Sequence, residues 1–396
     1  MVIVHLLTVL LFIYLLFTVS YLFILAIAGR FGKLNTYSSH PQKARFAVII
    51  PSYKDDSVII NTATEALRQD YPPGKYSVTV IADHLESETI RQLKSLPINL
   101  VEPRWEKSMK AKSLNAAFSQ LPSKDYDLAL ILDADNLMSP DCLEKVNHAF
   151  QTGWKAIQCH RIAKNRNNSI AILDALSEEI NNTVFRRGQR VLGLSCALIG
   201  SGMAFEFELL KGIFALPRIQ DNTGEDKEVE IQLIRNGILV EYIEDAYIYD
   251  EKVQRKEVFE KQRTRWLATQ LDNLRHLLAK DMRSNFKKLL YIHKIFEWLL
   301  LPRLLLMVLF ILLLSICAID AKTHLGILNP PWQWWVCLAL TYGAALLIAI
   351  PASFYNRPTL KAILKIPVLM FAMLKALLGI KKNKTGFLHT PKEFSG

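Results

Sequence analysis

Long apolar runs occupy the two ends of the chain, and the middle is more polar. Residues 1–29 contain no Asp, Glu, Lys or Arg, residues 299–319 carry Arg303 as their only charge, and residues 332–354 are again apolar. At about 1.5 Å per helical residue, each run is long enough to cross roughly 30 Å of hydrocarbon. The first run is too long for a signal peptide and lacks a preceding basic residue, which favours a retained anchor over residues 1–29.

The C-terminal region contains one further apolar segment of less certain type. Residues 363–380 are long enough to cross a membrane, but Lys365 and Lys375 interrupt them. Basic residues on both flanks favour an interfacial or re-entrant helix followed by a cytosolic tail. We therefore predict a C-terminal membrane region over residues 296–396, with two transmembrane helices, this third helix and the tail.

Short apolar runs alternate with helix-length segments in the middle of the chain. The runs are residues 47–50, 78–81 and 128–132, with a weaker one at 156–159. This alternation predicts an α/β domain with a parallel sheet, over residues 30–255. Ligands of such folds bind beyond the carboxyl ends of the strands. Polar residues follow those ends here, namely Ser52, Tyr53, Asp55, Asp83, Asp133 and Asp135.

Two long helices are expected after these strands. One covers residues 167–190. The other covers residues 258–278, which are amphipathic and rich in Arg, Lys and Trp. That composition is typical of a helix at a membrane surface, so residues 256–295 are predicted to be interfacial.

The formal net charge of +11 has two readings. A surplus of Lys and Arg can bind nucleic acid, or it can mark the cytoplasmic side of membrane spans. Basic residues follow the first and third apolar runs, and no aromatic–basic interleaving indicates nucleic acid. The five cysteines form no CxxC pair, which is in keeping with reduced thiols in a cytosolic domain. These patterns predict a multi-pass protein of the cell (inner or plasma) membrane with a cytosolic catalytic domain.

Asp133 and Asp135 form the first candidate site. Two carboxylates directly after a buried strand can reach one divalent cation, and Mg²⁺ or Mn²⁺ suits such oxygen ligands together with phosphate. A polar loop that closes the strand is the alternative, because a D-x-D triplet is common by chance.

Glu225 and Asp226 open a predicted helix over residues 227–235. A free carboxylate at this junction can act as a general base. Thr223 and Asp226 can equally form a capping box. Lys110 to Asn115, taken alone, is no more than the solvated start of an amphipathic helix.

The segment Gln262-Arg263-Thr264-Arg265-Trp266 is the rarest signal. Gln262, Arg265 and Trp266 are spaced to share one helical face. An amide and a guanidinium can hold a diphosphate, and an indole can stack on a sugar. The alternative is an interfacial helix that places Trp and Arg at the lipid headgroups.

Taken in order, these segments resemble the membrane-integrated members of glycosyltransferase family 2, which include cellulose, hyaluronan, chitin and poly-N-acetylglucosamine synthases, with ceramide glucosyltransferases as relatives. The matching segments are Pro51 to Asp55, Asp83, Lys110 to Asn115, Asp133 to Asp135, Gly200 to Gly202, Glu225 with Asp226, Gln262 to Trp266, and the tail around residues 387–392. The resemblance implies a GT-A (Rossmann-like) cytosolic domain that inverts the anomeric centre.

The resemblance also implies roles for individual residues. Asp226 would be the catalytic base, and Asp133 and Asp135 would bind Mg²⁺ or Mn²⁺. Donor-binding residues would be Ser52, Tyr53, Asp55, Asp83, Lys110, Asp133, Gln262 and Arg265. Acceptor-binding residues would be Gly200, Ser201, Glu225 and Trp266.

The expected reaction moves a hexose or N-acetylhexosamine from a UDP-sugar to a growing polysaccharide, with an accessory subunit as a further partner. One alternative is transfer of a single sugar to a membrane lipid, since the same catalytic set serves both. Another is an inactive scaffold, which would be expected to have lost Asp133, Asp135, Asp226 or Arg265. Arg303 either faces a polymer or extends to the headgroups, and the second is favoured.

Overall fold

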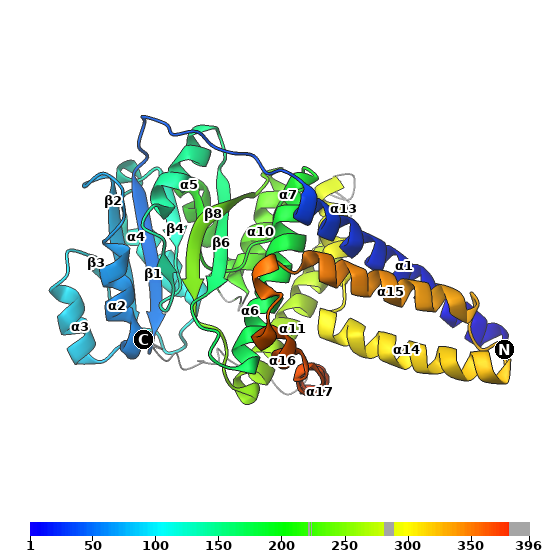
Figure 1. Cartoon of the computed structure of the whole chain (residues 1–396). Coiled ribbons are helices and arrows are strands. Elements are labelled where there is room, and N and C mark those ends of the chain that lie inside the picture. The colour runs from blue at the N-terminus through cyan, green and yellow to red at the C-terminus, as the bar shows by residue number, and fades with distance from the viewer. Residues whose placement is uncertain (221, 223, 281–288, 380–396) are drawn as a thin grey trace.

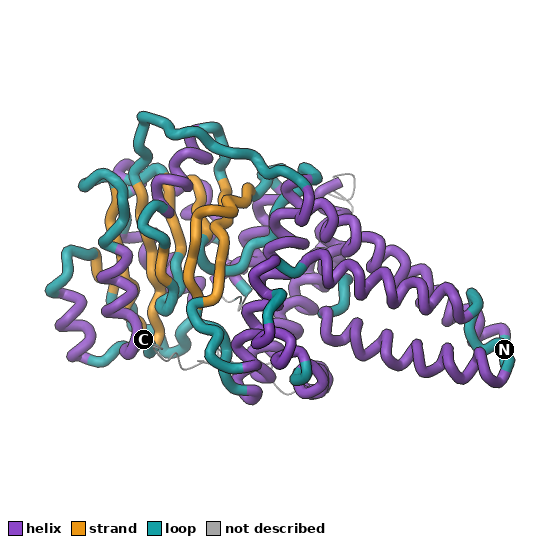
Figure 2. Tube along the Cα trace, viewed as in Figure 1, coloured by secondary structure: helices purple, strands orange, loops and turns teal. Residues whose placement is uncertain are grey.

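The computed structural model describes residues 1–220, 222, 224–280 and 289–379 of the chain. The strands form one sheet at one end of the molecule, and long helices extend from there toward the N-terminus (Figures 1 and 2). An α/β part and a helical part are therefore both present, as the apolar pattern predicts.

The sheet has eight strands in the order β3-β2-β1-β4-β7-β6-β8-β5. Their bounds are β1 Phe46–Tyr53, β2 Tyr76–Asp83, β3 Asn99–Val101, β4 Leu128–Ile131, β5 Leu137–Met138, β6 Ala156–Ala163, β7 Met203–Glu206 and β8 Glu241–Asp250. β1 pairs in parallel with β2 and with β4, and β2 pairs in parallel with β3. The first three apolar runs thus form adjacent parallel strands, and the polar residues after them meet at one edge.

The parallel pairing expected from the sequence holds for part of the sheet, which also contains antiparallel pairs. β7 lies antiparallel between β4 and β6, and β5 pairs antiparallel with β8. The run at 156–159 therefore joins the first strands only through β7. β7 has four residues and β5 has two, which is too short to produce a recognisable periodicity.

Helices cover both faces of the sheet because side chains alternate along its strands. Val48 and Ile50 of β1 pack with α2 Asp56–Ala66, α3 Ser87–Lys94 and α5 Cys142–Gln151. Ala47 and Ile49 point to the other face. That face is covered by α4 Lys110–Gln120, α8 Phe207–Phe214, α9 Pro217–Gln220 and α10 Glu225–Arg235. α4 begins at Lys110, where the sequence predicts the start of an amphipathic helix.

The long helix expected at residues 167–190 is present as three consecutive segments. They are α6 Ser169–Asn181, the π-helical turn η2 Asn182–Gly188 and α7 Gln189–Val191. Asn168 caps α6, since its side chain accepts from the backbone N–H groups of Ile170 and Ala171. A π-helical turn inside a helix is rare and often lies at a functional site.

Among the described residues, three helices are long and apolar enough to cross a membrane: α1 Val2–Phe31, α14 Arg303–Thr323 and α15 Trp332–Ala349. They lie side by side, away from the sheet (Figure 1). α1 also crosses η2 closely, because a Cβ on Gly29 would lie 2.0 Å from the Thr183 carbonyl oxygen and one on Gly188 would lie 2.3 Å from the Leu25 carbonyl oxygen. α1 thus packs directly on η2, which in turn contacts β8 of the sheet.

The remaining helices lie between these two parts. They are α11 Lys256–Lys280, α13 Leu289–Leu299, α16 Arg357–Ile363 and α17 Ile366–Gly379. α16 and α17 meet at an angle of 47°, which is the geometry of a broken span or a re-entrant loop. The expected tail after residue 379 lies outside the described residues, as does Thr223 of the predicted capping box. α10 has Gly224 as its N-cap.

Candidate active site

One cavity of about 1090 Å³ runs from the carboxyl ends of β1, β2 and β4 to α14, α15 and α17. It is lined by every site residue predicted from the sequence except Ser201, namely Ser52, Tyr53, Asp55, Asp83, Lys110, Asp133, Asp135, Gly200, Glu225, Asp226, Gln262, Arg265 and Trp266. Segments more than 200 residues apart in the sequence therefore share one site.

Asp83 ends β2 and is held by three neighbours. Its carboxylate accepts hydrogen bonds from Ser108 Oγ at 3.0 Å and Ser113 Oγ at 3.3 Å, and His84 Nδ1 lies 2.6 Å away. The His84 ring meets the Tyr53 ring edge-on, with centroids 5.6 Å apart. Asp83 is therefore fixed in place beside an aromatic pair, at the end of the cavity formed by the sheet.

Lys110 begins α4 and connects two of the predicted motifs. Its Nζ lies 2.6 Å from Asp133 Oδ1, 3.2 Å from Glu225 Oε1 and 2.7 Å from the Gly200 carbonyl oxygen. Burial alone would lower the pKa of Lys110, but the carboxylates of Asp133 and Glu225 raise it above its usual value. Lys110 is thus a fixed cation at the centre of the site.

Ser201 has a different place from the one predicted. It is fully buried, its Oγ accepts from the Asp133 backbone N–H at 3.0 Å, and it donates to Asn136 Oδ1 at 2.5 Å. Gly200 and Gly202, at φ 82° and 62°, form the turn that directs this side chain inward. The predicted contact of Ser201 with an acceptor is therefore wrong, and Ser201 instead supports the loop that carries Asp133 and Asp135.

Asp226 lies in the first turn of α10, next to Gly200. A Cβ on Gly200 would lie 3.9 Å from Asp226 Oδ2 and 3.8 Å from Lys110 Nζ. Burial and the Asp226 carboxylate raise the pKa of the adjacent Glu225, against the lowering effect of Lys110. Asp226 therefore lies beside Gly200 in the cavity lining, close to Lys110.

α11 closes the cavity with the Gln262 to Trp266 segment. Gln262, Arg265 and Trp266 all line the cavity, and Gln262 Oε1 is buried without a partner in the described part of the chain. Trp266 is 41% exposed, and the Arg263 guanidinium lies 4.3 Å from its ring. The shared helical face predicted from their spacing is thus directed at the cavity.

The family profile described as glycosyltransferase-like family 2 matches residues 41–269, which is more than half of the chain. The chain belongs to glycosyltransferase family 2. It therefore transfers a sugar from a nucleotide-sugar donor. Sequence comparison with the curated proteins finds no match.

The similarity to one solved structure agrees with this assignment at the level of fold. The mannosyltransferase PcManGT from Pyrobaculum calidifontis, solved with GDP-Man and Mn²⁺, has a TM-score of 0.59 and 17% identity, and the match covers 96% of this chain and all of that one. TarS residues 1–349 from S. aureus has a TM-score of 0.43 and 14% identity, and the match covers 85% of this chain and 92% of that one. The catalytic part of this family 2 glycosyltransferase has a GT-A-like fold.

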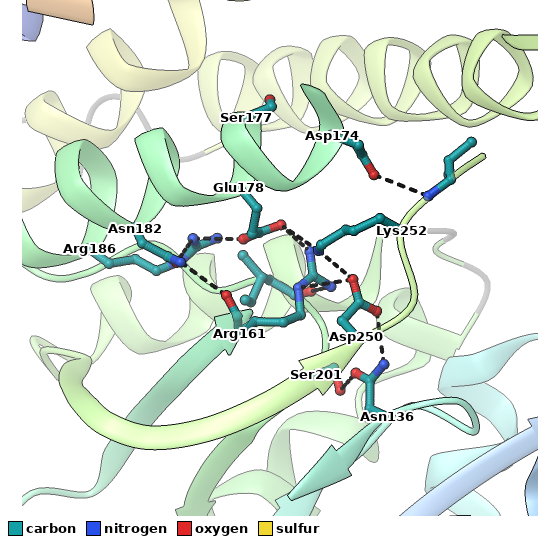
Figure 3. Close-up of polar contacts among 12 residues, drawn as sticks. Asn136, Arg161, Asp174, Ser177, Glu178, Asn182, Arg186, Ser201, Asp250 and Lys252 are labelled. Atoms are coloured by element: carbon teal, nitrogen blue, oxygen red, sulfur yellow. Dashed lines mark hydrogen bonds and ion pairs between the residues drawn. The ribbon is translucent and has the colours of Figure 1, made fainter. Parts of the chain in front are cut away.

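The glycosyltransferase site also contains a buried charge cluster that the sequence did not indicate (Figure 3). Glu178 of α6 lies 2.7 Å from Arg161 and 2.9 Å from Arg186. Asp250, at the end of β8, lies 2.6 Å from Lys252 and accepts from Asn136 at 2.8 Å. Because Asn136 also binds Ser201, the cluster continues to the loop of Asp133 and Asp135. These residues come from four separate elements, and no local pattern links them.

Arg303 belongs to the same region. Its Nη2 donates to both the backbone oxygen and the Oγ of Ser177 on α6, at 2.7 Å each. It also lines the cavity. The favoured prediction that Arg303 extends to the lipid headgroups is wrong, because α6 offers it protein acceptors inside the molecule.

The pair Asp133 and Asp135 has the chemistry of a divalent-cation site. Both carboxylates line the cavity, and the described residues contain no cluster of three or more His, Cys, Asp or Glu ligands. Mg²⁺ and Mn²⁺ commonly use one or two carboxylates and complete their shell with substrate phosphates and water. The residues present therefore fit a cation that binds together with a nucleoside diphosphate.

Proposed function

We propose that this glycosyltransferase moves a single sugar from a nucleotide-sugar to a hydroxyl of a membrane lipid. The observation that carries the proposal is the course of the cavity, which continues from Asp226 to apolar side chains of α14, α15 and α17 and of the residue that follows α15, namely Met307, Leu346, Leu347, Leu369, Met373 and Ile350. Such a lining suits hydrocarbon chains, whereas a sugar polymer would leave its hydroxyl groups without partners there.

Transfer with inversion needs one base. Asp226 removes the proton of the acceptor hydroxyl as its oxygen forms a bond to C1 of the donor sugar. The bond between C1 and the diphosphate oxygen breaks, and the nucleoside diphosphate leaves with the electron pair. Gln262 and Arg265 hold that diphosphate by directed hydrogen bonds, and Trp266 offers its exposed face to the acceptor. Most of the catalysis is therefore positioning and electrostatic stabilisation of the leaving group.

Asp133 and Asp135 would hold Mg²⁺ or Mn²⁺, which neutralises negative charge that develops on the leaving diphosphate. The Mn²⁺ in the PcManGT structure supports this choice of ions. Ser52, Tyr53, Asp55 and Asp83 would contact the nucleoside. The resemblance to membrane-integrated family 2 enzymes implies UDP as the nucleotide, and the GDP-Man in PcManGT makes GDP the second nucleotide to test.

We place the catalytic part in the cytosol, on the membrane side marked by the basic residues that flank the spans. The three apolar helices support membrane insertion by their length and composition.

The test uses full-length protein purified in detergent, radiolabelled UDP- and GDP-sugars, and a total membrane lipid extract. We expect label in the organic phase with one donor, as a product that carries one sugar, and none with Asp226→Asn. Label in an alcohol-insoluble polymer would instead establish the polysaccharide synthase, and label in neither fraction would reject both acceptors.

A further inference from the structure

α6 presents three polar groups toward the cavity, and each of them binds a guanidinium from a different element. Positions 174, 177 and 178 are spaced to share one helical face. The contacts are Asp174 with Arg263 of α11 at 2.7 Å, Ser177 with Arg303 of α14 at 2.7 Å, and Glu178 with Arg161 of β6 at 2.7 Å. One helix thus gathers three cations where the catalytic part meets the apolar helices.

Arg303 differs from the other two in its partner. Asp174 and Glu178 are carboxylates, but Ser177 is neutral, and Arg303 forms no ion pair within the described residues. Its Nη1 is buried without a hydrogen-bond partner there. Burying a cation without an opposite charge is costly. Arg303 therefore offers both a charge and a donor to a ligand in the cavity.

Among the groups that these contacts join directly around α6, the cations outnumber the carboxylates. The cations joined by these contacts are Arg161, Arg186, Lys252, Arg263 and Arg303, and the carboxylates are Asp174, Glu178 and Asp250 (Figure 3 shows most of them). Five positive groups thus face three negative ones. An anion in the cavity would reduce this imbalance, and a guanidinium is well suited to bind a phosphate or carboxylate.

The position of Arg303 indicates where the anion comes from. Arg303 is the first residue of the apolar helix α14, and Met307 one turn later also lines the cavity. Farther into the helices the lining is apolar, and in the other direction the cavity reaches Asp226. An amphiphile can therefore place its chains against α14 and α15, an anionic group at Arg303 and a hydroxyl near Asp226.

We propose that Arg303 binds the anionic group of the acceptor, and that the acceptor is an anionic lipid with a phosphate-type headgroup. This inference rests on the proposed transfer to a lipid and adds the charge of that lipid. A guanidinium and an anion form strong, directed hydrogen bonds when both leave water, so charge would decide which lipids occupy the cavity.

The test measures binding of two short-chain lipids to the full-length protein in neutral detergent. Dioctanoyl phosphatidylglycerol carries hydroxyl groups and a phosphate, and dioctanoylglycerol carries a hydroxyl without the phosphate. We expect the protein to bind the phosphate-bearing lipid about ten-fold more tightly. Arg303→Gln should remove that preference and Arg303→Lys should keep most of it. Arg357→Gln, at an exposed arginine outside the cavity, should keep all of it.

A parallel titration with UDP or GDP, whichever nucleotide the protein binds, serves as the second measurement. Unchanged nucleotide affinity in Arg303→Gln shows that the variant is folded and that Arg303 does not hold the donor diphosphate. The inference would be overturned if the unmodified protein bound both lipids equally, or if Arg303→Gln still preferred the phosphate-bearing lipid. It would also be overturned if Arg303→Gln lost as much affinity for the nucleotide as for the phosphate-bearing lipid. A labelled lipid product without any charge preference would reject this inference alone, whereas absence of a lipid product would reject the proposed function.

Discussion

The Lys110 ammonium group lies 2.6 Å from the Asp133 carboxylate, and this contact joins the start of α4 to the loop after β4. Lys110 also balances Glu225, at 3.2 Å. Removing the cation leaves two carboxylates facing one another with no charge between them. We expect Lys110→Gln to lower kcat/KM for the donor by about 10- to 100-fold, as Asp133 loses its fixed position.

Steady-state kinetics of nucleoside diphosphate release measures this effect. Lys107→Gln, at an exposed lysine three residues earlier, is the matched control and should leave kcat/KM unchanged. Full activity in Lys110→Gln would show that the Lys110–Asp133 contact has no part in the reaction.

Asp226 can be tested separately from the donor site. Asp226→Asn keeps the shape of the side chain but removes its capacity to accept a proton. Turnover should therefore fall by about 100-fold or more, while the nucleotide dissociation constant stays the same. The measurements are kcat and nucleotide binding by titration calorimetry. Asp272→Asn, at a carboxylate that is 69% exposed, is the control. Near-normal turnover in Asp226→Asn would assign the base to another residue.

The sequence was informative wherever a motif follows a local pattern. The runs before Ser52, Asp83 and Asp133 are strands because each is apolar and ends at a polar residue, and parallel pairing then brings those ends together. The spacing of Gln262, Arg265 and Trp266 predicted one helical face for the same reason. Such features depend on neighbours within a few residues.

Features that depend on tertiary contact were not predicted. Ser201 points inward because two glycines of positive φ surround it, and a glycine does not reveal its φ in the sequence. Arg161, Glu178 and Asp250 meet only because β6, α6 and the end of β8 are folded together. The position of Arg303 at the start of an apolar run favours the lipid headgroups, whereas in the structure α6 supplies Ser177 as its partner.

A substitution at Gly200 tests whether the open space beside Lys110 and Asp226 is needed for activity. Its φ of 82° strains any other residue, which costs about 1–2 kcal/mol of unfolding free energy in Gly200→Ala. The new methyl group would lie within 4 Å of both side chains without a clash. We expect activity to fall by about ten-fold or more, because the methyl group occupies volume where the substrates meet.

Gly193→Ala is the matched control, because its φ is 77° and nothing lies within 4 Å of the new Cβ. It should show the same loss of stability with full activity. Thermal unfolding of both variants measures the cost of the backbone strain, and kcat of both variants shows whether the methyl group at position 200 also blocks the substrates. Equal loss of activity in the two would mean that backbone strain alone is responsible.

Glu178 should make the fold sensitive to acid. Although burial alone would raise it, the pKa of Glu178 lies well below its usual value because Arg161, Lys252 and Arg186 surround it. The ionised Glu178 carboxylate therefore stabilises the folded state at pH values above about 4.3, the pKa of a Glu side chain in the unfolded chain. This stabilisation is lost as the pH falls below that value. Glu178→Gln leaves these cations without their shared carboxylate and should cost about 3–5 kcal/mol at neutral pH.

Thermal unfolding in detergent between pH 7 and the acid range measures both effects. Glu178→Gln should have a lower melting temperature at pH 7 and a shallower decline toward acid. Glu208→Gln, at an exposed position of α8, should follow the unmodified protein. An unchanged decline in Glu178→Gln would place the acid sensitivity in other carboxylates.

Gly224 sets the distance between the helix of Asp226 and the helix of Trp266. A Cβ at position 224 would lie 2.1 Å from Thr269 Cγ2 on α11, so Gly224→Ala must push α10 and α11 apart. We expect lower stability and at least a ten-fold loss of activity, because Asp226 then moves relative to the residues that hold the diphosphate.

A second substitution tests this explanation of the Gly224→Ala effect. Thr269→Ser removes the methyl group that the new Cβ would meet and keeps the hydroxyl. The double variant Gly224→Ala/Thr269→Ser should therefore recover much of the activity, with Thr269→Ser alone as its control. Failure to recover, at a stability close to that of Thr269→Ser, would show that Gly224 does not act through the close approach of α10 to α11.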